Sequence, residues 1–307
     1  MKQQARGHSS GKVIWMGEHA VVYGYPALVM PLKGSGVTVE LEQAEHLQVQ
    51  CLYHGQPLET EPTTFYPIRT LLEALTTQFP VPPLSVTIHL AIPLASGMGG
   101  SAATAAALTR AFYAFLGQPL SSEALFDWIQ VAETVAHHRP SGVDAMVMVH
   151  QKPLYYVKGE TPKAFHLEAT GFLLVVDSGQ PGHTRDAVAH VRENSQLLKT
   201  RQTLANLGAL TQPFFDALHT LSLVGMGEAM DEAHSLLGQL GVSSPQLDVM
   251  CQEARQAGAL GAKLTGGGLG GCILALVDTE ETLQALRATF RQAGYARQWV
   301  LDLAGLS

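Results

Sequence analysis

The sequence predicts an α+β protein built from two domains. Three observations lead to this prediction. The 307 residues are enough for two domains that each bury a core of their own. Alternating apolar and polar residues, typical of half-buried strands, dominate the first third of the chain, and helical spacing becomes common after it. The pattern restarts with a new strand after Thr161-Pro162-Lys163, so we expect the domains to be 1–163 and 164–307.

The first domain is predicted to mix sheet and helix. The strands predicted there are 12–15, 37–42, 47–52, 84–90 and 154–157. The predicted helices are 68–79, 101–116 and 123–137, the last of them following the capping serines Ser121 and Ser122. Because sheet and helix segregate rather than alternate strictly, an α+β fold is favoured over a doubly wound parallel sheet.

The second domain begins with the strand 172–177, which runs into one long helical stretch from Thr184 to about Leu210. The helix predicted at 245–257 has a clear start, with Ser244 as its N-cap and Pro245 in its first turn. The other predicted helices are 213–223, 227–240 and 280–293, and the other strands are 262–265, 272–277 and 297–303.

Charge and composition favour work on small molecules. The net charge is −7 and no basic run occurs, which argues against a nucleic acid or an anionic membrane surface as the main partner. The three cysteines form no CxxC pair, so we expect neither a disulfide framework nor a cysteine zinc site. A reducing, cytoplasmic compartment fits best, and we read no secretory signal at the N-terminus. Prolines and glycines interrupt the uncharged stretch between Glu73 and Arg110, so we predict no membrane span.

A glycine-rich segment in front of the helix 101–116 predicts a phosphate site. Residues 93–101 read Pro-Leu-Ala-Ser-Gly-Met-Gly-Gly-Ser. Glycines let successive backbone N–H groups converge on an anion at the positive end of a helix. The segment contains no lysine, so it is not the ordinary P-loop. Two matches to the dinucleotide-binding pattern, at 97–102 and 266–271, lack the strand and helix that this pattern requires, and we discount an NAD-dependent dehydrogenase.

Ser101 and Glu133 are the candidate magnesium ligands. Magnesium bound together with nucleotide phosphates needs only one or two protein oxygens. Glu133 falls at the border of the apolar face of the helix 123–137, whereas Glu123 and Asp127 fall well outside that face. On spacing alone, an ordinary boundary carboxylate is the commoner interpretation of Glu133.

Asp144 and Lys12 are the candidate catalytic pair. Pro140 and Gly142 break the preceding helix, so we expect Asp144 to project from a turn. An aspartate that faces Lys12 orients and partly deprotonates an alcohol, while the ammonium group stabilises the developing alkoxide. Taken singly, Asp144 is more often a helix N-terminal charge, and Lys12 a solvated strand lysine.

The histidines have two further interpretations. His19, which follows Glu18 in an otherwise apolar stretch, could donate to a substrate oxygen, although a packed structural histidine is the commoner case. The neighbours His137 and His138 diverge by about 100° on a helix, and no carboxylate or cysteine pattern completes a ligand set. We therefore expect no zinc site there.

Read together, three segments resemble the signature motifs of the GHMP kinases, the superfamily of galactokinase, homoserine kinase, mevalonate kinase and phosphomevalonate kinase. These segments are 11–24, 93–101 and 263–271, in the order in which the family has them. The first is similar to the mevalonate kinase form, because galactokinases place Thr-Asp after Gly-Glu-His. Residues 137–144, His-His-Arg-Pro-Ser-Gly-Val-Asp, are similar to that family's His-Gly-x-Pro-Ser-Gly-[Val/Ile]-Asp.

The resemblance implies a two-domain α+β kinase of the GHMP type, with the active site in the cleft between the domains and Mg²⁺ as cofactor. It makes Asp144 the catalytic carboxylate with Lys12 as its partner, and it makes Ser101 and Glu133 the metal ligands. The positions implied to line the acceptor site are Glu18, His19 and Thr184. Those implied to bind ATP are Pro93, Ala95, Ser96, Gly97, Met98, Gly99, Gly100, Ser101 and Ala102. Those of the loop implied to close the site are Gly266, Gly267, Gly268 and Gly270.

The implied reaction is phosphorylation of the 5-hydroxyl of mevalonate by ATP, in isoprenoid precursor synthesis. The chain departs from the family pattern at Gly100, where a first serine is common, and at His138-Arg139, which replaces Gly and a small or polar residue. An arginine beside the catalytic turn could pair with a substrate carboxylate or an extra phosphate. Phosphomevalonate kinase, or another small-molecule kinase of the superfamily, is therefore the first alternative. A catalytically silent nucleotide-binding module is the second, and a homodimer stays open.

Overall fold

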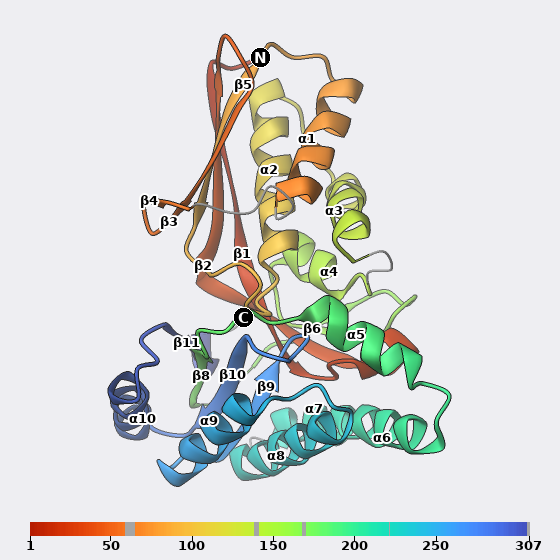
Figure 1. The fold of residues 1–307 in the computed structure, drawn as a ribbon, viewed down its shortest axis with the longest axis vertical. Coiled ribbons are helices and arrows are strands. Elements are labelled where there is room, and N and C mark those ends of the chain that lie inside the picture. Colours follow the sequence, from red (N-terminus) through yellow and green to blue (C-terminus); the bar gives the residue numbers. More distant parts are fainter. Residues whose placement is uncertain (59–64, 138–140, 168–169, 221, 306–307) are drawn as a thin grey trace. The chain divides into compact units, whose positions relative to one another are not determined.

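The computed structural model describes residues 1–58, 65–137, 141–167, 170–220 and 222–305. The chain divides into two compact units, both drawn in Figure 1. The first unit comprises Met1–Lys12, Pro31–Leu94 and Gly99–Gln151, and the second comprises Val13–Met30, Ala95–Met98 and Lys152–Ser307. The chain thus passes between the units five times. The division of the sequence into domains 1–163 and 164–307 stays a prediction.

The sheet of the first unit has the strand order β4-β3-β5-β2, and β1 also pairs with β2. Strand β5 pairs antiparallel with β2 and parallel with β3. Along β5 the buried residues alternate with half-buried ones, because side chains in a strand point to opposite faces in turn. The strands are β1 (Gln4–Met16), β2 (Ala27–Gln43), β3 (Gln48–Tyr53), β4 (Gln56–Pro57) and β5 (Leu84–Leu90).

Four helices of the first unit pack against one another beside this sheet (Figure 1). Alanines make α2 narrow, and most of its residues are buried. Strand β1 therefore passes very close to it at Gly7, where a Cβ atom would lie 2.2 Å from the carbonyl oxygen of Ala107. The helices are α1 (Tyr66–Gln78), α2 (Gly100–Leu116), α3 (Ser122–His137) and α4 (Val143–His150).

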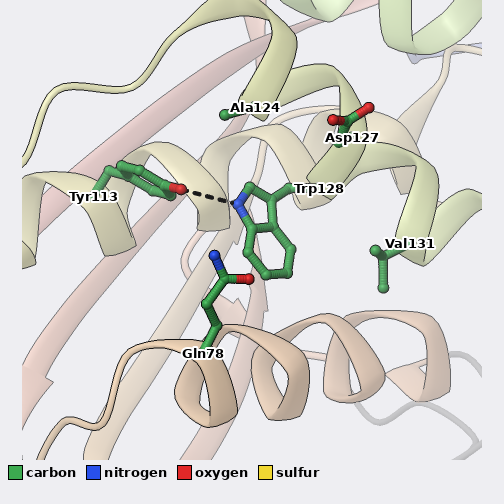
Figure 2. Close-up of a pocket in the computed structure, with 6 residues that line it drawn as sticks. All are labelled: Gln78, Tyr113, Ala124, Asp127, Trp128 and Val131. Atoms are coloured by element: carbon green, nitrogen blue, oxygen red, sulfur yellow. Dashed lines mark hydrogen bonds between the residues drawn. The ribbon is translucent and has the colours of Figure 1, made fainter.

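A surface pocket of about 270 Å³ lies among α1, α2 and α3 (Figure 2). The Nε1–H of Trp128 donates to the hydroxyl of Tyr113 at 3.1 Å, and these two side chains line the pocket together with Gln78, Ala124, Asp127 and Val131. None of the candidate site residues lines it. We therefore treat this pocket as separate from the candidate site.

The second unit contains a four-stranded antiparallel sheet of order β11-β8-β10-β9. Every residue of β10 is buried, which explains its unbroken apolar sequence. Helices α8 and α9 pack on β9, and α10 packs on β8 and β10. The sheet strands are β8 (Phe172–Asp177), β9 (Gly261–Thr265), β10 (Cys272–Val277) and β11 (Gln298–Asp302). The helices named here are α8 (Leu223–Gln239), α9 (Pro245–Gln256) and α10 (Glu280–Gln292).

The second unit also contains the segment Val13–Met30 and several further short strands and helices. Trp15 packs edge-on against Phe214 with ring centroids 5.0 Å apart, and its Nε1–H donates to the sulfur of Met230. The start of β2 pairs with β6, which in turn pairs with β7. These elements are η1 (Ala20–Tyr23), β6 (Leu154–Tyr156), β7 (Lys163–Ala164), α5 (Thr184–Glu193), α6 (Leu198–Ala209), α7 (Thr211–Thr220) and η3 (Leu303–Gly305).

Two sequence predictions about local structure are wrong. The helix expected from Thr184 to about Leu210 is two helices, because the side chains of Asn194 and Ser195 donate to the carbonyls of His190 and Arg192 and end the first of them. The segment expected to leave Asp144 in a turn instead begins α4, with Asp144 in the first helical turn.

Other predictions agree with the structure. Strands 84–90, 172–177 and 272–277 have the predicted bounds. The predicted cap is also confirmed, since the Ser244 side chain accepts a hydrogen bond from the N–H of Leu247. In the part of the chain that the structure describes, no helix combines the length and the apolar character needed to cross a membrane.

Candidate active site

Lys12 and Asp144 form an ion pair within the first unit. The Nζ atom of Lys12 lies 3.1 Å from Oδ1 of Asp144, and the lysine side chain is almost completely buried. Strand β1 supplies the lysine. Helix α4 supplies the aspartate directly after Gly142, which has a φ of 84° and serves as the N-cap. A carboxylate in a first helical turn is stabilised by the helix dipole. The sequence placed these two residues together, and the structure does so as well.

Ser101 and Glu133 meet beside this pair. Glu133, on α3, is only 4% exposed, which is deeper than its border position on the helix suggested. The Ser101 hydroxyl donates to its carboxylate. The pKa of Glu133 is raised to about 7, chiefly by burial and then by the negative charge of Asp144, while the hydrogen bond from Ser101 and the charge of Lys12 act in the opposite direction. Four polar side chains from β1, α2, α3 and α4 therefore converge in the first unit.

The donor set formed by Ser101 and Glu133 suits magnesium. A hydroxyl oxygen and a carboxylate oxygen are hard ligands, and Mg²⁺ commonly takes one or two protein oxygens and fills its remaining positions with phosphate oxygens and water. No cluster of three or more His, Cys, Asp or Glu side chains able to hold a metal is found among the described residues. A two-ligand site of this kind does not need such a cluster.

The glycine-rich segment contacts Lys12 directly. Gly99 has a φ of 69° and is the N-cap of α2. A Cβ atom there would lie 2.8 Å from Cγ of Lys12, so only glycine leaves room for the lysine stem. The first N–H groups of an α-helix have no partner inside the helix, which makes the start of α2 a suitable place for an anion. The predicted residues Gly100, Ser101 and Ala102 form this first turn.

A second group of candidate residues lies in the second unit. Lys263, on β9, forms an ion pair with Glu18, and both side chains are fully buried. The lysine also donates to the carbonyl of Leu264 at 2.8 Å. Burial lowers the pKa of Lys263, whereas the carboxylate of Glu18 raises it. The pair therefore fixes Glu18 at the start of the segment that carries His19.

His19 is packed inside the second unit. Its Nε2 atom lies 2.9 Å from the carbonyl oxygen of Gly267. Burial lowers the pKa of His19 to about 4, with the hydrogen bond to Gly267 acting in the opposite direction. The neutral ring therefore donates its Nε2–H to this carbonyl. This contact corresponds to the structural role that the sequence analysis considered the commoner one.

The predicted closing loop owes its glycines to tight backbone packing. A Cβ atom at Gly267 would lie 2.5 Å from Oγ1 of Thr184, so the predicted acceptor residues Thr184 and His19 both contact Gly267. The other close approaches of a Cβ atom are Gly266 with Gly97, Gly268 with Val242 and Gly270 with Pro181, each to a backbone atom within 2.8 Å. The family resemblance implies that this loop closes the site. The structure adds that close backbone packing requires its glycines.

The first part of the predicted ATP loop joins this packing. Ala95, Ser96, Gly97 and Met98 belong to the second unit. The carbonyl of Ala95 accepts from the N–H of Gly182 at 2.6 Å, two residues before Thr184. Pro93 belongs to the first unit. His138 and Arg139, the two departures from the family pattern next to Asp144, lie outside the described residues.

Lys263 is the main residue that the sequence analysis missed. It lay inside the predicted strand 262–265 and was given no role. A charged residue in an otherwise apolar strand was the available signal, because a buried lysine needs a partner. The identity of that partner was not accessible from sequence spacing, since Glu18 lies 245 positions earlier.

Two family models match the chain. The model described as the GHMP kinases N terminal domain matches residues 66–152, and the one described as GHMP kinases C terminal matches residues 214–296. The mevalonate kinase of Aeropyrum pernix is 32% identical over 309 residues, covering 96% of this chain and 95% of that protein. The mevalonate kinase of Thermococcus onnurineus is 30% identical, covering 91% of this chain and 90% of that protein.

Solved structures are similar along the full chain. The mevalonate kinase of methicillin-resistant Staphylococcus aureus MRSA252 has a TM-score of 0.78 at 28% identity, covering 99% of this chain and 100% of that one. The L. major mevalonate kinase in complex with R-mevalonate has a TM-score of 0.83 at 24% identity, covering 98% of each chain. These comparisons confirm the predicted α+β fold with N- and C-terminal domains of the GHMP type.

Replacing Glu133 with glutamine is expected to change the pH dependence of stability in metal-free protein. The carboxyl group holds its proton up to a pH of about 7 when folded, but only to about 4.5 in its ordinary state. Between these values the folded state binds the extra proton, so the free energy of unfolding falls as the pH rises. Glu133→Gln should therefore be more stable than the wild type at pH 8, by on the order of 3 kcal/mol, and similar at pH 4.

Chemical denaturation at both pH values, with a chelator present, measures this difference. Glu123→Gln, at the exposed start of the same helix, is the matched control and should show no such dependence on pH. A Glu133→Gln variant whose stability difference from the wild type is equal at both pH values would contradict the prediction.

Replacing Lys263 with methionine is expected to destabilise the protein by about 3–5 kcal/mol, because the carboxylate of Glu18 is then buried without its cation. The double variant Glu18→Gln with Lys263→Met should recover a large part of this loss. Urea denaturation measures both, and the exposed Lys158→Met in the same unit is the control. If the single variant were as stable as the wild type, the ion pair would contribute nothing to the fold.

Proposed function

Since the chain belongs to the GHMP kinase family, we propose that it is a mevalonate kinase, which uses ATP to phosphorylate the 5-hydroxyl of mevalonate. The products would be 5-phosphomevalonate and ADP, a step in making isoprenoid precursors. The proposal follows the relatives that share about 30% of their residues with this chain and carry that activity in their names.

The observation that carries the proposal is the convergence of Lys12, Asp144, Glu133 and Ser101. The ion pair joins a buried ammonium group to a carboxylate that is still 26% exposed on its side chain. A carboxylate of this kind can reach a substrate hydroxyl while its partner stays fixed. Phosphoryl transfer needs such positioning together with positive charge, and little else from the protein.

In the proposed reaction Asp144 orients the 5-hydroxyl and accepts its proton as the oxygen attacks the γ-phosphorus in line. The bond from that phosphorus to the bridging oxygen breaks, and ADP leaves. Lys12 stabilises the negative charge that develops on the attacking oxygen and on the transferred group. No covalent phosphoenzyme is needed, because nucleophile and phosphoryl group meet directly.

Magnesium is the proposed cofactor, held by Ser101 and Glu133 together with phosphate oxygens of ATP. When bound, it would neutralise charge on the phosphates. The first turn of α2 and the glycine-rich segment before it would supply backbone N–H groups to the same phosphates. Glu133 would have to lose its proton to act as a ligand, and a pKa of about 7 makes this easy near neutral pH.

Glu18, His19 and Thr184 are the proposed acceptor-site residues. The ion pair to Lys263 and the hydrogen bond to Gly267 support a positioning role for the first two. Thr184 begins α5 and lies against Gly267, so its hydroxyl lies close to the residue that His19 contacts.

We also propose a cytoplasmic location, supported by three buried cysteines that are all free thiols. Two functions remain to be tested against this one: phosphomevalonate kinase and a catalytically silent module.

A panel of acceptors tests the function. Purified protein is incubated with ATP and mevalonate, 5-phosphomevalonate, galactose or homoserine, and the release of ADP is followed, first with magnesium and then with a chelator. We expect ADP release with mevalonate, and its loss on chelation. Turnover of 5-phosphomevalonate alone would replace the proposal by a phosphomevalonate kinase. Silence with every acceptor would support a module without catalytic activity.

Asp144→Asn is expected to lower kcat by at least about 10²-fold, the usual effect of removing a general base. Nucleotide binding should persist, because asparagine can still hydrogen-bond to Lys12. Steady-state kinetics and a fluorescent nucleotide titration measure the two effects. Asp127→Asn, in the pocket of Figure 2, is the control that should leave kcat unchanged. Near-normal turnover by Asp144→Asn would refute the catalytic role.

A further inference from the structure

Arg110 links the two elements that carry the Lys12–Asp144 pair. From α2 its Nη1 atom donates to the carbonyl of His8 at 2.9 Å, and its Nη2 atom donates to the carbonyl of Met148 at 2.6 Å. His8 lies on β1, four residues before Lys12. Met148 lies on α4, four residues after Asp144. One guanidinium group therefore joins β1, the strand that carries Lys12, to α4, the helix that carries Asp144.

A second link lies at the same end of α4. Gln151 is the C-cap residue, in the left-handed conformation with a φ of 52°. Its side-chain amide donates to the carbonyl of Met148 at 3.0 Å and accepts from the hydroxyl of Ser10 on β1 at 2.8 Å. The C-terminal end of α4 is thus tied to β1 through both Arg110 and Gln151.

Helix physics explains why a cation stands here. The last carbonyls of an α-helix have no partner inside the helix, and positive charge at that end is favoured by the helix dipole. An arginine offers several donors in one rigid plane, so it reaches two carbonyls at once, which the single ammonium group of lysine does less well. The near end of β1 is already held against α2 at Gly7. Arg110 and Gln151 therefore add direct polar links between α4 and its neighbours to the packing of α4 on α2 and α3.

We propose that Arg110, assisted by Gln151, is a positioning residue for phosphoryl transfer. It holds α4 against β1 so that Asp144 stays within ion-pair distance of Lys12. This inference rests on the proposed kinase activity. Arg110 acts through the two catalytic residues, so its loss should slow the chemical step without weakening the binding of ATP or of the acceptor.

Kinetics of Arg110→Met, Arg110→Lys and the wild type test this role. A misplaced catalytic group costs up to about 10²-fold in rate. We expect kcat to fall about 10- to 100-fold in Arg110→Met while both KM values change less than about threefold, and we expect partial recovery in Arg110→Lys. Arg69→Met is the control, because this arginine of the same unit pairs at the surface with Glu73. An unchanged kcat in Arg110→Met would overturn the proposal.

A double-mutant cycle separates positioning from general damage. In the Asp144→Asn background the position of α4 no longer matters for proton transfer, so adding Arg110→Met should lower kcat by less than about threefold. A further loss as large as in the wild-type background would show that Arg110 acts elsewhere, and it would overturn the proposal.

A measurement that needs no turnover keeps this inference apart from the proposed function. In a crystal structure of Arg110→Met we expect the distance from Lys12 Nζ to Asp144 Oδ1 to exceed about 4 Å, the limit for an ion pair. A distance that stays at 3.1 Å would overturn the proposal. If the wild type phosphorylates no acceptor, the function fails, and this distance still decides the positioning role.

Milder variants cover the case in which Arg110→Met does not fold. Ser10→Ala and Gln151→Met each remove the Ser10–Gln151 hydrogen bond and leave Arg110 in place. We expect each to lower kcat about threefold, and this loss should disappear in the Asp144→Asn background. Full activity in both variants would overturn the contribution of Gln151, and with it the proposed two-point attachment of α4.

Discussion

The ion pair between Lys12 and Asp144 is the interaction on which the candidate site depends. It joins the long strand β1 to the first turn of the short helix α4, two elements that are far apart in the sequence. Almost no solvent reaches the lysine, so separating the charges would remove the carboxylate that compensates a buried ammonium group, which is costly. Helices α2, α3 and α4 pack against one another beside the pair, and this packing brings Ser101 and Glu133 to the same place.

The second unit also contains a buried ion pair, and in this one both side chains are fully buried. Glu18 and Lys263 are both fully buried and satisfy each other, while the segments around them pack backbone to backbone. Glycine at Gly266 and Gly268 permits approaches that any Cβ atom would prevent. The composition of this loop therefore reflects packing at least as much as freedom of movement, and the residues proposed to hold the acceptor rest on a rigid base.

Local patterns in the sequence were sufficient for most elements. The strands 84–90 and 272–277 were predicted because alternation, or an unbroken apolar run that follows a pair of glycines, is a short-range signal. Helix α4 was missed, because Pro140 and Gly142 were interpreted as the end of structure although Gly142 begins a new helix. The break after Glu193 was missed for the related reason that side-chain caps compete with the backbone locally.

The candidate site could not be derived from local patterns at all. Lys12, Ser101, Glu133 and Asp144 come from four elements, and their convergence was implied by the resemblance to a family rather than by spacing. Two residues were left without a role: Lys263, to which the resemblance assigned nothing although it lies in the third matching segment, and Arg110, which lies outside the matching segments. Both are charged groups whose partners are distant in the chain or are backbone carbonyls, and neither kind of partner leaves a trace in the sequence.

The division of the early chain between the two units has a consequence for biosynthesis. Residues 13–30 leave the ribosome early, yet Ile14 bonds to a threonine 251 positions later, and Trp15 packs on Phe214. The stretch from Val13 to Met16, which is buried in the folded protein, therefore stays uncovered at least until Phe214 and Thr265 have been translated. Apolar surface exposed in this way during synthesis favours aggregation of the unfinished chain.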